Sequence, residues 1–512
     1  MKNLQNSVYH LIKKLSKSEK RYFRLMSNLQ EGEKQYLTLF DIIVDYPIEE
    51  QSTRQIEEDI VKQLEGVIPK KRFSAVKQYL LKQLLQMLRT LYRKHSVDGL
   101  ILQNLMDREV LLAKDLDRMA RNKLKNARKE AEKNERYYLL LHILDLELQY
   151  TTQRTGSLQD LKNLHNIKAR VFKNLELEGQ YQSIHQEAFI LYKTKRSRKK
   201  EYLDRVNELL NHKLLQNIGD AKTFEAQISA YSAKAILFMM TNNIPSSNAA
   251  FRKIIEIMEA YPMMKKLYPR RYFVFLSNYL QSCHRLGKYD EFLGIWEKMG
   301  AIKPKNEDGK YEFKLKTAQS KLQIYLNTGN LQAARAAAIE VSEVIDVYSA
   351  TSESFRKTRV AGSWFNLAMY HFLVGDFEKA RSIFESLDTK RSNVRTDIES
   401  ISQIFELLCW RELVQEEEFL SYLNLRTKRK LKRKEGLFKF ERDFLSLLAR
   451  IGRLPDESSK EKYFRRFLEK QMSQLKNDPT KIAGKEEIRL WIKSKLEKKP
   501  MIEVFLSELN RR

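Results

Sequence analysis

The residues best suited to chemistry in this sequence are clustered cations. Residues 426–434 hold seven Lys or Arg side chains and no acid, and residues 193–200 hold six. Cations packed this densely attract anions over long distances and can contact the phosphates of a nucleic acid. The candidate anion contacts are Lys193, Lys195, Arg196, Arg198, Lys199, Lys200, Lys428, Arg429, Lys430, Lys432, Arg433 and Lys434.

Smaller basic clusters lie at residues 70–72, 121–129 and 265–271. A structural interpretation of every cluster stays open, because long helices use Lys and Arg both as solvated surface and as good helix formers. The run at 193–200 also falls at an expected helix end, where cations meet the negative end of the helix dipole. Tyr192 and Tyr202 flank that run; they could stack on bases, but they fit a core between helices equally well.

Motifs for catalysis or cofactor binding do not occur in the sequence. There is no G-x-x-x-x-G-K-[ST] phosphate loop, no G-x-G-x-x-G and no H-E-x-x-H. The histidines are scattered, and no two stand three or four residues apart as a helical pair of metal ligands would. Cys283 and His284 are adjacent, but neighbours on a helix point about 100° apart. We therefore predict that Cys283 is buried and His284 is on the surface, and we expect no catalytic residue, cofactor or metal.

The overall composition is typical of a helical protein. Sixteen Gly and nine Pro in 512 residues are less than half of the roughly 12% that average usage provides. An all-β fold needs a turn about every 8–12 residues, so this scarcity argues against one. Lys and Arg number 94 against 66 Asp and Glu, and the resulting net charge of +28 favours an acidic partner.

The sequence also bears on the compartment in which the protein works. No segment reaches the ~18 uncharged apolar residues of a membrane span, and the first residues lack the apolar stretch of a secretory signal. The two cysteines, Cys283 and Cys409, cannot build a disulfide framework. We therefore expect a cytoplasmic protein that does not bind membranes.

A regular period runs along the chain from about residue 100. Amphipathic helical segments come in pairs, and the breaks inside the pairs are 41–46 residues apart, with a mean of 43. They lie near Asp115, Gly156, Lys199, Asn243, Gly287, Gly329, Gly375, Glu417 and Ser459. Such a period predicts stacked helical hairpins whose helices are about 16–20 residues long.

The units around Gly287, Gly329 and Gly375 share one order of residue types. Large apolar and small residues of a first helix precede the glycine, and small and aromatic residues of a second helix follow it. They are Leu276, Leu280, Phe292, Trp296 and Pro304 in the first unit, Leu322, Tyr325, Ala334 and Ala338 in the second, and Trp364, Leu367, Ala368, Ala380 and Phe384 in the third. This order resembles the tetratricopeptide repeat, although the period is near 43 rather than 34.

The resemblance implies an all-α fold: a right-handed, tetratricopeptide-like α-solenoid of about eight to nine helical hairpins with helical caps. Repeats of the HEAT type also have periods of about 40–47 residues, but the Gly-aromatic-x-x-Ala turn favours the tetratricopeptide pattern. In such an array a glycine ends each first helix in a left-handed cap, and aromatics such as Phe384 fill the space between hairpins.

The two ends of the chain do not follow the period. Ser16 and Glu19 form a capping-box signature, and we expect helices at 33–46, 51–64 and 72–93. Residues 15–23 look like the opening of an uncharacterised family of bacterial helical-repeat proteins, a likeness that implies no activity. We predict an N-terminal helical cap or domain at 1–95, helical repeats at 96–475 and a C-terminal helical cap at 476–512.

Three functional hypotheses follow. The first is a non-catalytic scaffold whose concave surface binds a protein or peptide, because a repeat array forms an extended groove. The second is a nucleic-acid-binding regulatory protein, for DNA or RNA, that uses the basic clusters. The third is an enzyme whose site is assembled from distant repeats. The oligomeric state, the partner and the binding face stay open.

Overall fold

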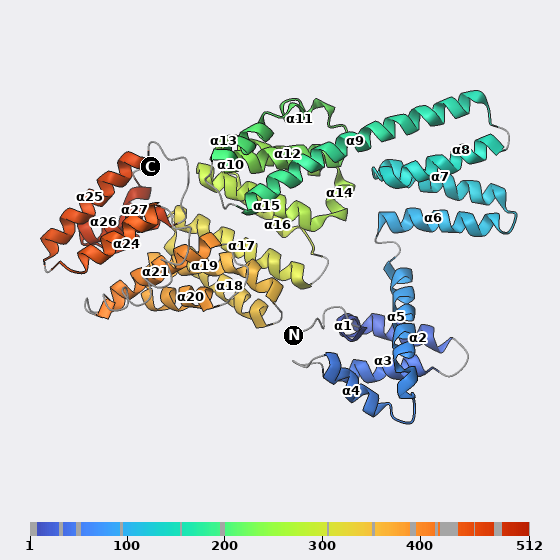
Figure 1. The fold of residues 1–512 in the computed structure, drawn as a ribbon, viewed down its shortest axis with the longest axis horizontal. Helices are drawn as coiled ribbons and strands as arrows, with labels where there is room; N and C mark the ends of the chain where they lie inside the picture. Colours follow the sequence, from blue (N-terminus) through green and yellow to red (C-terminus); the bar gives the residue numbers. More distant parts are fainter. Residues whose placement is uncertain are drawn as a thin grey trace. The chain divides into compact units, whose positions relative to one another are not determined.

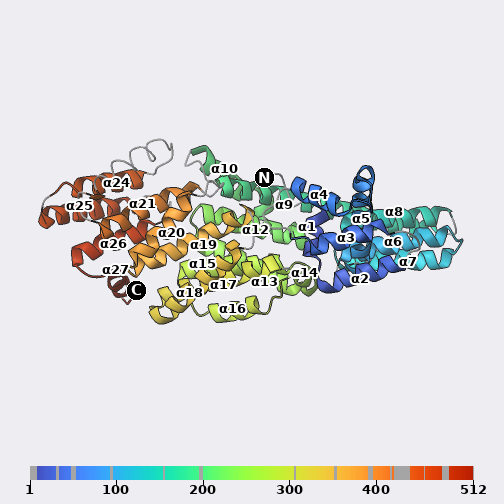
Figure 2. The ribbon, with the colours of Figure 1, turned by 90° about the horizontal axis from the view of Figure 1, so that it is seen from below.

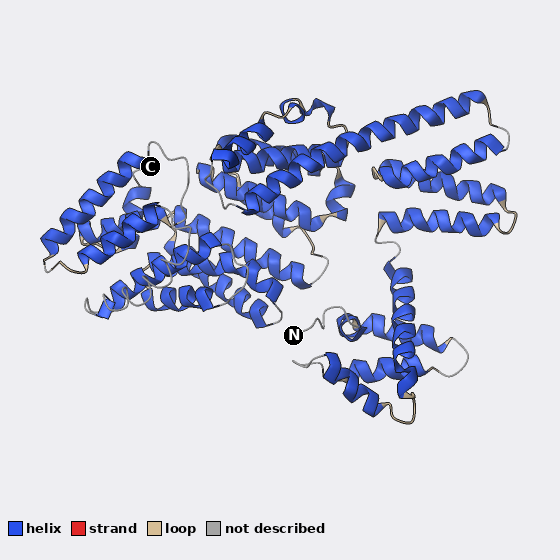
Figure 3. Cartoon of the chain, in the orientation of Figure 1, coloured by secondary structure: helices blue, strands red, loops and turns tan. Residues whose placement is uncertain are grey.

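The computed structural model describes residues 8–29, 34–47, 53–92, 96–153, 156–194, 200–304, 307–350, 354–389, 396–414, 418–419, 439–454, 456–475 and 484–510. Within these ranges the regular elements are helices and no strand occurs, which confirms the predicted all-α fold (Figures 1 and 3). The chain divides into two units, Met1–Val171 and Phe172–Arg512. Among the described helices, none combines the length and hydropathy that crossing a bilayer requires.

Five helices at the start of the first unit enclose one apolar core. They are α1 (Val8–Lys14), α2 (Lys17–Asn28), α3 (Gln35–Asp45), α4 (Thr53–Gln63) and α5 (Lys70–Tyr92). Fully buried Tyr9, Phe40 and Leu84 belong to this core. The predicted capping box is confirmed: the Glu19 amide donates to Ser16 Oγ at 3.2 Å, and the Ser16 amide donates to the Glu19 carboxylate at 2.6 Å. The helix that starts at Ser16 and the helices expected at 33–46, 51–64 and 72–93 form close to the predicted bounds, and α1 is an additional helix.

Helices α6 (Val97–Leu112), α7 (Asp117–Lys133) and α8 (Tyr137–Gln153) follow and pack side by side (Figures 1 and 2). Buried alanines on α7, including Ala127 and Ala131, let its neighbours approach closely. The next helix, α9 (Leu158–Thr194), runs for 37 residues without a break. The expectation of helices of about 16–20 residues is wrong here. Gly179 is exposed inside α9, and one glycine costs a helix only about 1 kcal/mol, too little to end it.

The second unit continues as consecutive helix pairs. Its leading segments are α10 (Lys200–Leu210), α11 (Lys213–Gln216) and a 3₁₀ turn at Ile218–Asp220. The pairs are α12 (Phe224–Met240) with α13 (Ile244–Ala260), α15 (Pro269–Leu286) with α16 (Phe292–Gly300), α17 (Glu307–Asn327) with α18 (Leu331–Ala350), and α19 (Ser354–Leu373) with α20 (Phe377–Thr389). Short α14 (Pro262–Leu267) precedes α15, and α21 (Thr396–Leu413) contacts both α19 and α20. First helices also contact each other, because α15 touches α17 and α17 touches α19.

The turns inside three of these pairs are built alike. Gly287, Gly329 and Gly375 have φ values of 69°, 73° and 84°, so the predicted left-handed glycine caps are confirmed. After each glycine the next amide returns to the helix: the Lys288 amide donates to the Cys283 carbonyl at 3.1 Å, and the other two turns repeat this bond. This is the Schellman arrangement, which satisfies carbonyls that a helix end otherwise leaves unpaired.

Aromatic side chains connect one pair to the next. Phe384 of α20 is fully buried and stacks on Phe405 of α21 at 5.7 Å between ring centroids. Phe273 of α15 stacks on Phe313 of α17 at 3.7 Å. Trp296 of α16 lies 6.2 Å from Tyr325 of α17. The predicted place of Phe384 between hairpins is confirmed, and Trp296 lies between hairpins as well. These contacts carry the apolar core from pair to pair.

The C-terminal helices pack as a small cluster. They are α24 (Lys439–Ile451), α25 (Glu457–Leu475), α26 (Lys485–Glu497) and α27 (Met501–Leu509). Arg489 of α26 donates to the Glu508 carboxylate of α27 at 2.8 Å, and Lys493 bonds the same group. The hydrogen bond from Arg489 is the main reason that the pKa of Glu508 falls to about 2, and Lys493 adds to the effect.

Replacing Gly287 by alanine tests the left-handed cap. A Cβ at Gly287 would meet no atom within 4 Å, so the cost is conformational, about 1 kcal/mol for an alanine in this region. We expect Gly287→Ala to lower the free energy of unfolding by that amount. Gly294, inside α16 and equally uncrowded, is the matched control: Gly294→Ala should raise it by about 0.5–1 kcal/mol. Urea unfolding followed by circular dichroism measures both, and two changes of the same sign would contradict the cap.

The Glu508 cluster predicts a pH-dependent stability. Its folded pKa lies below the unfolded value of about 4.3, so the stabilisation is present above that pH and is lost as the pH falls toward about 2. With solvent screening allowed for, Glu508→Gln should lower the free energy of unfolding at pH 7 by about 1–2 kcal/mol. The gap from wild type should shrink below about pH 4.3. Exposed Glu497 on α26 provides the control, Glu497→Gln; a gap that does not change with pH would refute the assignment.

Candidate functional site

The two dense basic runs are mostly beyond what the structure describes. Lys195, Arg196, Arg198 and Lys199 lie outside the described residues, and so do Lys428, Arg429, Lys430, Lys432, Arg433 and Lys434. Lys200 is the first residue of α10. Lys193 is exposed near the end of α9, with its ammonium 4.5 Å from the centre of the Phe189 ring. The anion-binding hypothesis for these runs therefore stays a prediction.

Three cations of the basic cluster on α7 make contacts within the first unit. Lys123 bonds Asp107 of α6 at 2.7 Å. Arg128 bonds Glu132 at 2.9 Å and Glu147 of α8 at 2.6 Å. The guanidinium of Arg121 lies 5.2 Å from the Tyr150 ring. These cations hold α6, α7 and α8 together.

The cluster at 265–271 is engaged in the same way. Arg270 bonds Glu312 of α17 at 2.8 Å, and Arg271 bonds Glu225 of α12 at 2.7 Å. Lys265 lies over the Tyr272 ring at 5.3 Å. By contrast, residues 70–72 at the start of α5 have exposed side chains. Two of the three smaller clusters thus connect helices, in agreement with the structural interpretation.

Of the two predictions for the adjacent Cys283 and His284, only the one for Cys283 is confirmed. Cys283 is fully buried, and burial raises the pKa of its thiol. The Asn248 amide donates to Ser282 Oγ at 2.8 Å and to the Cys283 sulfur at 3.3 Å, so this group is part of the core. The prediction that His284 lies on the surface is wrong. It is half-buried, with Nε2 3.4 Å from the Asn327 amide, because α17 packs against α15.

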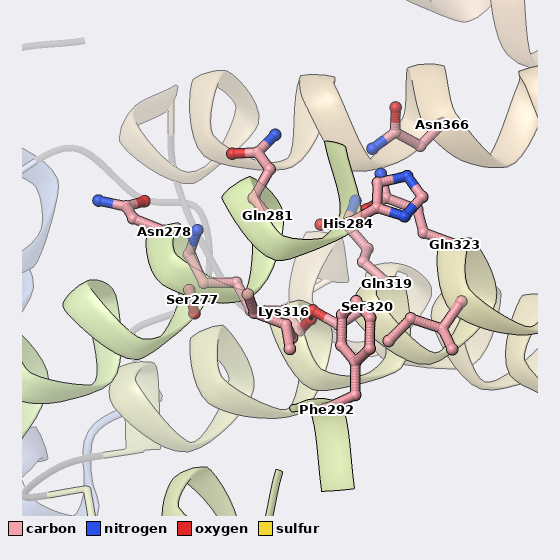
Figure 4. A pocket seen from close by; sticks show the side chains of 12 residues that line it. Ser277, Asn278, Gln281, His284, Phe292, Lys316, Gln319, Ser320, Gln323 and Asn366 are labelled. Carbon is pink, nitrogen blue, oxygen red and sulfur yellow. Dashed lines mark hydrogen bonds between the residues drawn. The ribbon is translucent and has the colours of Figure 1, made fainter. Parts of the chain in front are cut away.

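His284 lines a pocket between the first helices of three successive pairs (Figure 4). The pocket has a volume of about 110 Å³. Its twelve lining residues are Ser277, Asn278, Leu280, Gln281 and His284 of α15, Phe292 of α16, Lys316, Gln319, Ser320, Gln323 and Ile324 of α17, and Asn366 of α19. Figure 4 shows His284, Gln323 and Asn366 at one end, and Ser277, Asn278 and Lys316 toward the other. We call this set the amide groove.

The amide groove places polar side chains where neighbouring helices normally present apolar ones. On α17 Lys316, Gln319 and Gln323 recur at spacings of three and four residues, which puts them on one helix face. On α15 Ser277, Gln281 and His284 recur in the same way. Buried Leu280, Phe292 and Ile324 form the apolar part of the wall. The two polar faces oppose each other across the pocket.

Two buried polar atoms in the groove have no hydrogen-bond partner within the described part of the chain. They are Ser277 Oγ and Gln319 Nε2. A buried donor or acceptor that stays unpaired costs about 1–3 kcal/mol, so native structures keep few of them and each calls for a cause. Both side chains line the pocket, so a ligand whose binding turns these two atoms toward it and pairs with them would provide that cause.

The groove residues follow the period of the turns. Asn278, Ser320 and Asn366 each stand nine residues before the turn glycine of their own unit, and Gln281 and Gln323 stand six before it. The sequence analysis did not single out these positions, because it compared the apolar residues of the units. The signal for the groove is a polar residue that recurs at the same position when the units are aligned on their turn glycines.

The described residues contain no group of His, Cys, Asp and Glu side chains that could hold a metal ion. Comparison with protein-family models, with curated proteins and with solved structures finds no match. The function must therefore be argued from the groove itself.

The unpaired nitrogen predicts that Gln319→Leu stabilises the protein. Leucine has a similar size but no donor, so the variant should raise the free energy of unfolding by about 1 kcal/mol. Asn248→Leu is the matched comparison, because the amide nitrogen of Asn248 has partners, and its loss should lower that free energy by about 1–3 kcal/mol. Urea unfolding at pH 7 measures both; a destabilised Gln319→Leu variant would mean that the nitrogen is already satisfied.

Proposed function

We propose that the second unit is part of a right-handed, tetratricopeptide-like α-solenoid and that the protein is a non-catalytic scaffold. The proposed array has about eight to nine hairpins with a period near 43. Side-chain contacts one period apart support it. Arg285 bonds Asn242 at a separation of 43 residues, and Asn327 lies beside His284 at the same separation. Arg270 and Glu312 are 42 apart. Contacts that repeat at the sequence period are what stacked units produce.

In this proposal the scaffold binds a segment of a partner protein in the amide groove. The observation that carries the proposal is the convergence of polar side chains from α15, α17 and α19 on one pocket with two unpaired buried atoms. In a solenoid the first helices of successive pairs line one face, so the groove would lie on the concave side. Binding there would use positions that recur from unit to unit.

Nucleic-acid binding is the second candidate and is less well supported. Lys123, Arg128, Arg270 and Arg271 bond carboxylates of neighbouring helices, so these four cations are already engaged within the protein. The hypothesis keeps the exposed cations at 70–72 and Lys193, together with residues 195–199 and 428–434, which lie outside the described ranges. An enzyme with a dispersed site ranks third, and the cytoplasmic location stays a prediction.

A blocked groove tests the scaffold. Ser320 lines the pocket, so the indole of Ser320→Trp should fill it, whereas Ala336→Trp places the same side chain on an exposed position of α18. We expect chemical cross-linking in native lysate to capture the same proteins with wild type and with Ala336→Trp. Ser320→Trp should capture at least tenfold less of them, because a tenfold weaker complex has lost about 1.4 kcal/mol of binding free energy.

Thermal unfolding of both tryptophan variants is the control that tests whether the fold is kept. Two results contradict the proposal. One is a set of captured proteins that Ser320→Trp leaves unchanged, and the other is no capture by the wild-type protein.

A further inference from the structure

We propose that the amide groove recognises the main chain of an extended, acidic peptide segment. The inference rests on the proposed scaffold function and names the occupant of its groove. Four features of the groove support it: the chemistry of its side chains, their spacing, the contact between its helix walls and its charge.

The polar lining matches the peptide group. Each Asn or Gln side chain carries a carbonyl acceptor and an NH₂ donor, and the groove holds five such amides, on Asn278, Gln281, Gln319, Gln323 and Asn366. A peptide main chain offers the complementary donor and acceptor at each residue. The unpaired Gln319 Nε2 could donate to a peptide carbonyl, and Ser277 Oγ could donate or accept. An apolar ligand would leave both atoms unpaired.

The spacing of the amides suits an extended strand. Gln319 and Gln323 are four residues apart on α17, and so are Ser277 and Gln281 on α15. Four residues of helix rise about 6 Å. An extended chain repeats every two residues, about 6.6 Å. Successive side chains on either wall can therefore reach every second residue of one strand.

The contact between the walls of the groove argues against a helical ligand. Helices α15 and α17 touch each other, and a helix with its side chains is about 10–12 Å across. A third helix therefore has no space between them, whereas an extended segment is narrower than a helix.

The charge of the lining selects acidic partners. Its twelve residues include one cation, Lys316, and no carboxylate, and the chain as a whole carries +28. The net charge attracts an acidic segment over long distances. Lys316 then favours an Asp or Glu near the end of the groove where Ser277 and Asn278 lie. Most of the contacts remain neutral, so recognition would depend on the main chain more than on one motif.

The experiment uses the full chain and a probe obtained by selection. A random twelve-residue peptide library displayed on phage is selected against the immobilised protein. The most enriched peptide is synthesised with a fluorescein label, and its Kd is measured by fluorescence anisotropy. We expect the enriched peptides to contain more Asp and Glu than the unselected library. N-methylation of alternate main-chain nitrogens should weaken binding at least tenfold, because it removes donors and leaves the side chains unchanged.

Matched variants locate the site. Gln319→Leu combined with Gln323→Leu should raise the Kd at least tenfold, and Lys316→Gln about threefold to tenfold. The controls are Gln332→Leu on the exposed surface of α18 and Lys314→Gln, an exposed residue of α17. Both should change the Kd less than twofold. Because the double leucine variant removes an unpaired donor, its melting temperature should not fall, which separates lost binding from lost folding.

The outcomes distinguish this inference from the scaffold function. Peptides that bind the double leucine variant as well as wild type, or that tolerate N-methylation, overturn the main-chain inference, while capture that Ser320→Trp abolishes would still support the scaffold. A selection that enriches no peptide, or only peptides without excess acid, also overturns the inference. A twenty-residue oligothymidine is the competing probe. If it displaces the peptide and binds the Lys316→Gln variant more weakly than wild type, the ligand of the groove is a nucleic acid and not a peptide.

Discussion

The left-handed glycine turn inside three of the helix pairs determines the positions of the residues around it. Gly287, Gly329 and Gly375 end a first helix with the same returning amide, and a turn of fixed geometry fixes how the two helices face each other. Every side chain of the first helix then has a defined direction relative to that turn. The apolar residues meet the partner helix, and the residues nine and six positions before the glycine are directed to a different face. Core and groove are two consequences of one backbone constraint.

The groove holds polar residues that weaken the fold. Ser277 Oγ and Gln319 Nε2 are buried without partners in the described part of the chain, although leucine or alanine at these positions would pack without that penalty. Strain or unpaired groups that persist in a stable structure commonly mark functional sites. Aromatic contacts such as Phe273 with Phe313 and Phe384 with Phe405 supply compensating packing energy between the pairs.

Much of the architecture could be predicted from local sequence. The glycine turns, the capping box at Ser16 and the buried Cys283 each depend on residues close together in the chain. The uninterrupted α9 could not be predicted from local sequence. A lone exposed glycine such as Gly179 suggests a break, and only the summed helix propensities of its neighbours show that the helix continues. The groove could not either, since its walls come from three helices. The partners of Arg270 and Arg271 stand 42 and 46 residues away, and a charge count cannot reveal such pairing.

The charged residues and the neutral amides would contribute to different stages of binding. Arg128 and Arg271 bond carboxylates within their units, so part of the positive charge of the chain stabilises helix contacts and is not exposed to a ligand. The remaining excess still produces a long-range field, which raises the rate of encounter with acidic partners but discriminates poorly among them. Neutral amides act only at contact distance and lose little strength with salt, because neither partner is ionised. A site that combines the two would meet acidic segments quickly and then retain those whose main chain can extend along the groove.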